Sequence, residues 1–153
     1  MKFVDSVKIH VRSGRGGSGC TSFRREKYVP QGGPDGGDGG DGGSIVFVGD
    51  RSRSTLLDLS FQQHQHAEDG ARGMGKNRHG RKGSDLKIPV PLGTVIRNAE
   101  NGEVLLEVLE DREYLLLHRG RGGRGNARFK TSTNRVPEYH QPGESGEELW
   151  VQL

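Results

Sequence analysis

The sequence predicts a mainly β protein, in which an antiparallel barrel or sandwich of about eight short strands carries a glycine-rich projection. Two observations favour this fold class. Apolar residues gather in short alternating runs, and none of these runs has a convincing amphipathic helical period. Between the runs glycine recurs at every third residue, most regularly over residues 32–43. Three residues per turn is the repeat of the left-handed polyproline II helix, so the projection is expected to consist of paired segments of that kind.

The strands are expected where hydrophobic residues alternate with polar ones or form a short apolar run between turn signals. The stretch 44–48 is almost wholly apolar and should be central. Asn101-Gly102 should form a two-residue hairpin turn. The expected strands are 3–11, 44–48, 55–61, 86–90, 94–97, 103–109, 114–118 and 147–153. A single domain of residues 1–153 is therefore expected, with a barrel base from strands near 3–13, 44–61, 85–118 and 146–153, and a projection from 14–43, 66–84 and 119–145.

Glycine spacing predicts a packed seam between the segments of the projection. Only glycine fits where extended backbones touch, so a glycine at every third position marks a buried line. A flexible glycine linker is the alternative, but the spacing recurs in several segments, which favours one packed bundle. Asp35, Asp38 and Asp41 should form an acidic ridge, solvated or paired with neighbouring cations. The expected seam residues are Gly33, Gly36, Gly39, Gly42, Gly80, Gly83, Gly120 and Gly123.

Composition limits the size of the apolar core and indicates the cellular compartment. With 29% hydrophobic residues and 26 glycines among 153 residues, the chain can bury only a modest apolar core, so backbone hydrogen bonds and close glycine packing must hold the rest. Cys20 is the only cysteine, which excludes an internal disulfide and favours a reducing compartment. No apolar run approaches membrane-spanning length. A cytoplasmic protein with no membrane span is expected.

Positive charge is concentrated in the glycine-rich loops. The net charge is +3, and the charged residues of 71–84 and 119–135 are all basic. Arginine-glycine elements can line grooves that bind polyanions and can stack guanidinium planes on bases. Contact with nucleic acid is therefore preferred over the alternative that these arginines only solubilise a bare backbone.

Motifs for catalysis or metal binding are weak. Two segments that start at Gly14 and Gly120 match Gly-x-Gly-x-x-Gly, but neither is followed by the helix that a dinucleotide site needs. The phosphate-loop pattern Gly-x-x-x-x-Gly-Lys-Ser/Thr is absent, so no NTPase activity and no catalytic residue are expected in this chain. His64 and His66 would share one face of a strand, but no third ligand is near in sequence, and no metal site is expected. Cys20 should be a small buried residue.

Several motifs together resemble one known family. Residues 23–30 are Phe-Arg-Arg-Glu-Lys-Tyr-Val-Pro, and Gly-Gly-Pro-Asp-Gly-Gly-Asp-Gly-Gly follows at 32–40. Gly-Arg-Lys-Gly at 80–83, Pro-Leu-Gly-Thr at 91–94 and Gly-Gly-Arg-Gly-Asn-Ala-Arg-Phe at 122–129 complete the pattern. This order resembles the N-terminal, glycine-rich domain of the Obg family of GTPases over essentially the whole chain. The resemblance implies the Obg fold, a barrel base that carries six left-handed polyproline-type helices.

The resemblance also implies a function. The parent of such a domain hydrolyses GTP with Mg²⁺ in a following domain, and acts in assembly of the large ribosomal subunit and in the stress response. That GTPase domain is expected after residue 153, so the chain is expected to be truncated and to hold no cofactor itself. Its loop tips would bind rRNA near the peptidyl transferase region, partly mimicking a tRNA. The chain is expected to be a monomer whose partner is the large ribosomal subunit.

The resemblance and the charge distribution together assign RNA contacts to basic residues of three loops. Two positions depart from the family pattern, because Gln31 stands where some relatives have lysine and Glu138 where some have arginine. One contact should be missing at each. Two alternatives remain open: a protein-interaction module that binds an acidic partner without direct RNA contact, and disordered arginine-glycine RNA binding. The expected RNA-binding residues are Arg24, Arg25, Lys27, Lys76, Arg78, Arg81, Lys82, Arg124, Arg128 and Arg135.

Overall fold

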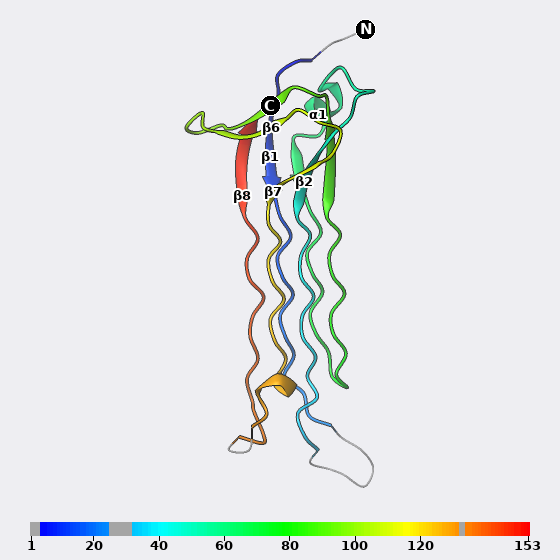
Figure 1. Cartoon of the computed structure of the whole chain (residues 1–153). Helices are drawn as coiled ribbons and strands as arrows, with labels where there is room; N and C mark the ends of the chain where they lie inside the picture. Colours follow the sequence, from blue (N-terminus) through cyan, green and yellow to red (C-terminus); the bar gives the residue numbers. More distant parts are fainter. Residues whose placement is uncertain (1–3, 25–31, 132–133) are drawn as a thin grey trace.

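Eight strands and two short helices make up the regular structure of this chain in a computed structural model, which describes residues 4–24, 32–131 and 134–153 (Figure 1). The protein is mainly β, as the sequence predicts. The helices are α1 Leu57–Phe61 and η1 Asn126–Phe129, the second of the 3-10 type. The strands are β1 Lys8–Arg12, β2 Ile45–Gly49, β3 His64–His66, β4 Leu86–Val90, β5 Thr94–Asn98, β6 Val104–Val108, β7 Glu113–Leu117 and β8 Glu148–Gln152.

The strands lie in two mixed sheets, which with α1 we call the base. One sheet has the order β3-β1-β8-β5-β6 and the other β4-β2-β7, and neither order closes into a barrel within the described chain. β1 pairs in parallel with β3, and β2 in parallel with β4. The expectation of a wholly antiparallel base is therefore wrong. Two parallel neighbouring strands must be joined by a long connection. In each of these pairs the connection includes glycine-rich segments.

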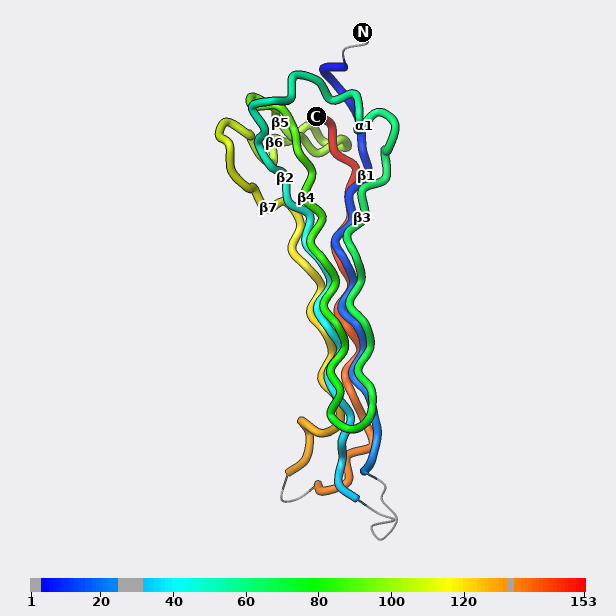
Figure 2. Tube along the Cα trace, turned by 90° about the vertical axis from the view of Figure 1, so that its right-hand side faces the viewer, coloured from blue at the N-terminus to red at the C-terminus, as the bar shows by residue number. Residues whose placement is uncertain are grey.

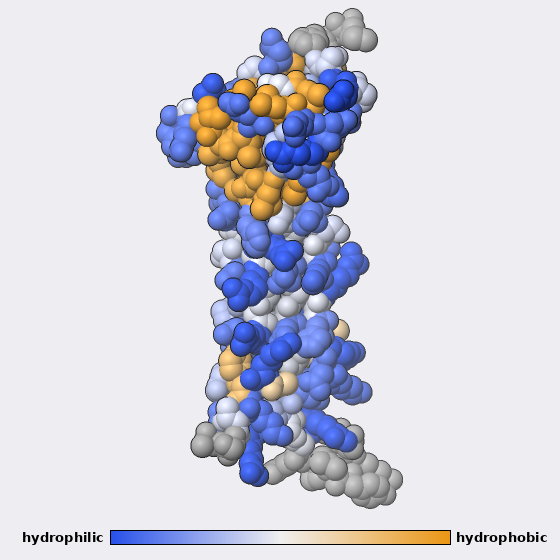
Figure 3. All heavy atoms as spheres, in the orientation of Figure 1, coloured by the Kyte–Doolittle hydropathy of each residue, from blue (hydrophilic) through white to orange (hydrophobic). Residues whose placement is uncertain are grey.

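The apolar core is confined to the base. Ile9 and Val11 of β1 are fully buried, as the alternation in that strand predicts, and they pack in one cluster with Ile45, Phe47 and Val151. Four of the five residues of β2 are buried, which fits its expected central position. Apolar side chains accordingly gather over the base in the space-filling view, whereas hydrophilic ones cover most of the remainder of that face (Figure 3).

One predicted strand is a helix instead. Residues 55–61 were expected to be extended with Leu57, Leu59 and Phe61 on one face, but they contain α1. The Thr55 hydroxyl accepts a hydrogen bond from the Leu57 amide at 3.2 Å and so satisfies a donor at the helix start. Phe61 is 74% exposed, so it contributes no buried apolar side chain that would favour the extended conformation. The edge strand forms just afterwards, as β3.

The turn between β5 and β6 is also longer than predicted. The Asn98 amide bonds to the Glu103 carbonyl, and the Gly102 amide bonds back to the Asn98 carbonyl, both at 2.8 Å. These bonds enclose a four-residue loop, 99–102, in place of the expected two-residue turn. Gly102 has φ of 74°, a conformation that glycine adopts without strain, which explains the glycine at this position.

Six glycine-rich segments extend side by side from the base (Figures 1 and 2). The backbone hydrogen bonds between them repeat every three residues. We call these segments the shaft, and the loops at the end remote from the base the tip. The shaft segments are 13–20, 35–43, 67–74, 79–85, 119–126 and 137–147. Between the first two, amides of residues 14, 17 and 20 bond to carbonyls of residues 43, 40 and 37 at 2.7, 2.8 and 3.0 Å. The same three-residue step recurs between the second segment and its other neighbours.

Close backbone contact explains the glycines of the shaft. A Cβ atom added at Gly39 would overlap the Gly17 carbonyl, and one at Gly80 would overlap the Ala71 carbonyl. Gly33 differs, because the nearest atom to its added Cβ would be Lys130 Nζ, at an ordinary contact distance of 3.5 Å. Backbone carbonyls of neighbouring segments similarly leave no room for a side chain at Gly36, Gly42, Gly83, Gly120 and Gly123.

Candidate nucleic-acid interface

The tip lies at the opposite end of the molecule from the C-terminus, and its second loop is a tight turn (Figures 1 and 2). The Met74 amide bonds to the Arg78 carbonyl at 2.8 Å, and Lys76 and Asn77 have positive φ of 62° and 54°. The guanidinium of Arg78 donates to the Gly75 carbonyl at 3.0 Å, which orients that side chain. Lys76 and Arg78 are both exposed, and neither forms an ion pair with any described residue.

The third loop is fixed by Asn126, whose side chain is completely buried. Its carbonyl oxygen accepts a bond from the Gly36 amide at 2.8 Å, and its amide group donates to the carbonyls of Ser22 and Pro137 at 2.9 and 3.0 Å. One side chain therefore connects three parts of the chain at the end of the shaft that bears the tip. Immediately after it, η1 places Phe129 against the half-exposed ring of Tyr139, with 4.8 Å between the ring centroids.

A cavity of about 870 Å³ opens between the first and second loops. Its walls include Phe23, Arg24, Lys76 and Arg78, which combine an aromatic ring with three cations. Asp35 also lines it, and this carboxylate is only 7% exposed. Its Oδ1 atom is buried and accepts no hydrogen bond from any described residue. A buried oxygen without a donor is costly, so this atom is suited to accept a bond from a ligand.

The three aspartates of the second segment do not form the solvated ridge that was one of the two expectations. Asp41 Oδ1 accepts a bond from the Gly122 amide, and Asp38 Oδ1 accepts one from the Gly125 amide, both at 2.9 Å. The partner advances by three residues at each step, so the next one would be residue 128. There η1 interrupts the pattern, because the Arg128 amide bonds to the Gly125 carbonyl at 3.1 Å. Asp35 is consequently left without this backbone donor.

The predicted RNA-binding residues are divided between tip and shaft. Arg24 is held at the tip by a bond from its amide to the Gly33 carbonyl at 2.9 Å. Arg128 belongs to η1, and Arg135 lies in the loop that follows η1. Lys76 and Arg78 belong to the second turn. Arg25 and Lys27, with the departure at Gln31, lie outside the described residues. The residues that lie along the shaft, not at its end, are Arg81, Lys82 and Arg124.

Acidic residues of neighbouring segments form ion pairs with some of the basic residues, although they lie far from them in the sequence. Arg128 Nε lies 2.7 Å from Asp38 Oδ2, and Arg81 pairs with Glu68 at 3.4 Å. Arg119 of the same acid-free stretch lies 3.5 Å from Asp41. Two shaft cations, Arg81 and Arg119, and one tip cation, Arg128, therefore have an acidic partner within the fold. Lys76 and Arg78 of the tip have no such partner among the described residues.

Comparison with known proteins identifies the family. The family model described as GTP1/OBG matches residues 4–153. The chain belongs to the GTP1/OBG family. It is 53% identical to the GTPase Obg of Persephonella marina, 56% identical to that of Syntrophus aciditrophicus and 57% identical to that of Syntrophotalea carbinolica. Each match covers 100% of this chain but only 45%, 45% and 43% of the relative. The GTP1/OBG chain thus spans less than half the length of these proteins.

Some residues of this GTP1/OBG chain that shape the tip were not singled out as sites from the sequence. The sequence does not indicate the role of Asn126, because that role depends on contacts with residues far along the chain. Phe129 and Tyr139 gave no signal, since their pairing needs the third loop to fold back. Lys130 belongs to the acid-free basic stretch, and it is exposed without an ion pair among the described residues, so charge alone could have identified it.

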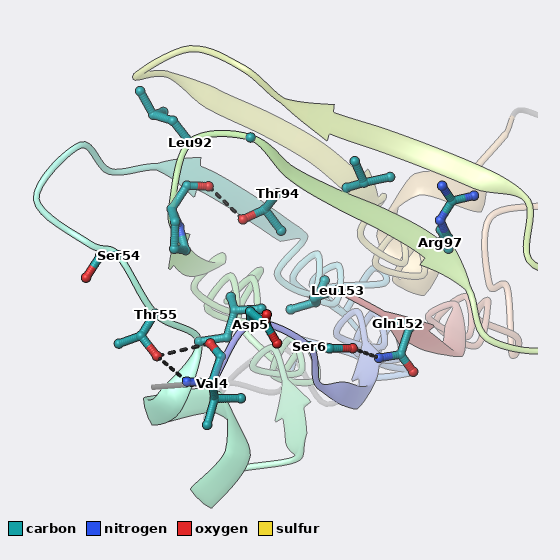
Figure 4. Close-up of a pocket in the computed structure, with 14 residues that line it drawn as sticks. Val4, Asp5, Ser6, Ser54, Thr55, Leu92, Thr94, Arg97, Gln152 and Leu153 are labelled. Carbon is teal, nitrogen blue, oxygen red and sulfur yellow. Dashed lines mark hydrogen bonds between the residues drawn. The ribbon is translucent and has the colours of Figure 1, made fainter. Parts of the chain in front are cut away.

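A second hollow of the GTP1/OBG chain lies at the base, beside the C-terminal residue Leu153 (Figure 4). It measures about 430 Å³, and several of its polar groups are already bonded to one another. Thr55 bonds to the backbone of Val4, and Gln152 donates to the Ser6 hydroxyl at 2.7 Å. Among the described residues that line it there is no histidine, no cysteine and no pair of carboxylates. In the part of the chain that the structure describes, no helix is long and apolar enough to cross a membrane.

Proposed function

We propose that this chain is the ribosome-binding part of an Obg-type GTPase, and that its tip binds rRNA of the large ribosomal subunit near the peptidyl transferase region. The observation that carries the proposal is the tip cavity, where Lys76 and Arg78, which form no ion pair with any described residue, lie beside the Phe23 ring and a carboxylate oxygen that accepts no bond from a described residue. Phosphates, bases and hydroxyl groups of RNA complement these three kinds of group.

The shaft is proposed to be a bundle of six left-handed polyproline II helices. Support comes from the three-residue step of the hydrogen bonds that join its segments, since three residues per turn is the repeat of that helix. An isolated polyproline II helix has no internal hydrogen bonds, but here the amides at every third residue bond to neighbouring segments. Such a bundle is stiff, so little conformational entropy is lost when it enters a narrow cavity.

Each group of the tip has a proposed role. Lys76 and Arg78 contact phosphates and supply most of the affinity, and Lys130 and Arg135 add to this charge. Phe23 and Tyr139 offer surfaces on which unstacked bases can lie. Asp35 accepts a hydrogen bond from an amino group of a base or from a 2′-hydroxyl, which favours RNA that can place such a donor inside the cavity.

The activity of the whole protein is proposed from its relatives, whose name is GTPase Obg. We infer that the longer protein binds GTP with Mg²⁺ in a separate domain, and that it acts in large-subunit assembly and in the stress response in the cytoplasm. In this view residues 1–153 form one Obg domain, which acts as a monomer. The chain itself lacks the phosphate-loop pattern and supplies docking rather than hydrolysis.

Site-specific photo-crosslinking to purified large subunits tests the proposal. A photoreactive phenylalanine analogue replaces Tyr139 at the tip in one variant and Phe61 of the base in the control, since these aromatic residues are 50% and 74% exposed. Crosslinks from position 139 to rRNA, with few from position 61, are expected. Crosslinks from position 139 to ribosomal proteins alone would contradict RNA docking and support the protein-interaction alternative.

A further inference from the structure

Three histidines converge at the edge of the five-stranded sheet. His64 and His66 lie two residues apart in β3, so they share one face of that strand, as the sequence predicts. The third ligand that the sequence seemed to lack comes from β1, which pairs in parallel with β3 and sets His10 opposite His64. No residue near His64 in sequence could reveal this partner, because 53 residues separate the two histidines and only the strand register joins them.

The ring nitrogens are close enough to share one ion. One nitrogen from each of the three histidines lies within 4.8 Å of the other two, and His10 Nδ1 is 3.0 Å from His66 Nε2. Tetrahedral Zn²⁺ holds imidazole nitrogens at about 2.0 Å, which places two such nitrogens about 3.3 Å apart. The three rings are mutually inclined by 59°, 81° and 76°, so they are not stacked face to face. Small side-chain rotations would complete the site.

We propose that His10, His64 and His66 form a Zn²⁺ site, with a water molecule in the fourth position. The open position follows from exposure, because His64 and His66 both face solvent while His10 is half-buried. Neutral imidazole suits Zn²⁺, and a site of three histidines and one water is a known arrangement for this ion.

The surroundings of the site support this assignment. Glu148 Oε2 lies 3.7 Å from His10 Nε2, so a His10 ring that binds metal through Nδ1 can present its other nitrogen to a carboxylate. Carboxylates in this position orient histidine ligands and raise their basicity. Arg12 opposes the charge of a bound cation, whereas Glu148 offsets it.

Bound Zn²⁺ would join the edge strand to the sheet where the shaft begins. β3 has only three residues, and its ends are held by bonds from the His10 amide to the Gln63 carbonyl at 2.7 Å and from the Ala67 amide to the Arg12 carbonyl at 2.9 Å. The shaft segment 67–74 starts directly after His66. The ion would therefore fix the direction in which this segment leaves the base, independently of what the tip binds.

Titration of the untagged, EDTA-treated 153-residue chain with Zn²⁺ tests the inference. Trp150 is the only tryptophan, and its ring centroid lies 5.1 Å from that of His10 and 5.7 Å from that of His64. Co²⁺ should quench its fluorescence and show the visible absorption of a four-coordinate ion, and Zn²⁺ should reverse both. Calorimetry should give one Zn²⁺ per chain, and hydrogen exchange of the Ala67 amide should slow when the ion is added.

Matched histidine variants assign the binding to this site. His64→Gln and His66→Gln should each weaken Zn²⁺ binding by about 10-fold or more, since each removes one of three protein ligands. His118→Gln, at an exposed histidine outside the cluster, should leave it unchanged, and circular dichroism should be the same for all variants. Absence of stoichiometric binding, or equal affinity in the wild type and both cluster variants, would overturn the inference. An equal loss in His118→Gln would overturn it as well.

Discussion

At the scale of single residues, the buried side chain of Asn126 connects several parts of the chain at the tip. Its side chain accepts one bond and donates two, and its backbone amide bonds to the Cys20 carbonyl at 2.9 Å. No other residue type of this size can accept and donate in this pattern, because aspartate lacks the donors and leucine lacks both functions. The loops that bear the cations therefore depend on one buried amide group.

Replacement of Asn126 by leucine should loosen the tip without unfolding the base. The Gly36 amide and the carbonyls of Ser22 and Pro137 would lose their partner, which should cost about 3 kcal/mol locally. Native-state hydrogen exchange of the Gly36 amide should accelerate about 100-fold. The control is Asn101→Ala, which removes one exposed bond to the Glu103 amide and should change exchange at Gly36 little. Unchanged exchange at Gly36 in Asn126→Leu would contradict this role.

Gly80 tests the packing of the seam. Its added Cβ would overlap the Ala71 carbonyl, so even a methyl group has no room. Gly80→Ala and Gly80→Glu should both lower the free energy of unfolding by about 3 kcal/mol or more, with the methyl group accounting for most of the loss. Gly33→Ala is the control and should have a small effect, since among the described residues its Cβ would make only an ordinary contact, with Lys130 Nζ. Urea denaturation measures all three, and a neutral Gly80→Ala variant would contradict the seam.

At the scale of elements, the aspartates of the second shaft segment connect it to the segment 119–126. Asp41→Ala should cost about 1 to 3 kcal/mol, because it leaves the Gly122 amide without its acceptor. Asp41→Asn keeps an oxygen acceptor and loses only the 3.5 Å contact of opposite charges with Arg119, so its cost should be less than about 1 kcal/mol. Thermal unfolding of the two variants separates hydrogen bonding from charge. Equal losses would show that charge pairing is the main contribution.

The sequence predicted those elements whose cause is local. The alternation of Val7, Ile9 and Val11 predicted β1, and the apolar run 44–48 predicted β2 within one residue at each end. The glycine spacing predicted that the intervening segments pack closely, and the contacts of Gly39 and Gly80 explain why. Local patterns were sufficient there because the period of the side chains is itself the signal.

Features that depend on distant contacts could not be predicted. The strand expected at 55–61 is α1, since polar bonds around Thr55 outweigh a short apolar alternation that leaves Phe61 exposed. The histidine cluster forms because β1 pairs in parallel with β3. Its prediction would require the register between strands more than 50 residues apart, which no local pattern contains. In the candidate site, charge identified Lys76 and Arg78, but it could not reveal that Asp38 pairs with Arg128 or that Asp35 is left without a donor.

At the scale of the whole molecule, the apolar core and the cationic tip are separated by the length of the shaft (Figures 1 and 3). The base is held by hydrophobic packing, whereas the shaft is held by backbone hydrogen bonds between close-packed glycines. Changes of charge at the tip should therefore alter binding while leaving stability nearly unchanged. Changes within the seam should alter both.

Binding of the chain to purified large ribosomal subunits as a function of salt concentration tests the central claim most directly. The variant pair Lys76→Gln with Arg78→Gln removes two tip cations, and the pair Lys87→Gln with Arg97→Gln removes two cations of the base, so both variants have the same net charge. The tip pair should reduce the slope of log affinity against log salt by about 2, about 1 for each phosphate that is no longer neutralised, whereas the base pair should leave the slope unchanged. Equal slopes for the wild type and the tip pair, or an equal decrease in the base pair, would contradict docking of this tip onto RNA.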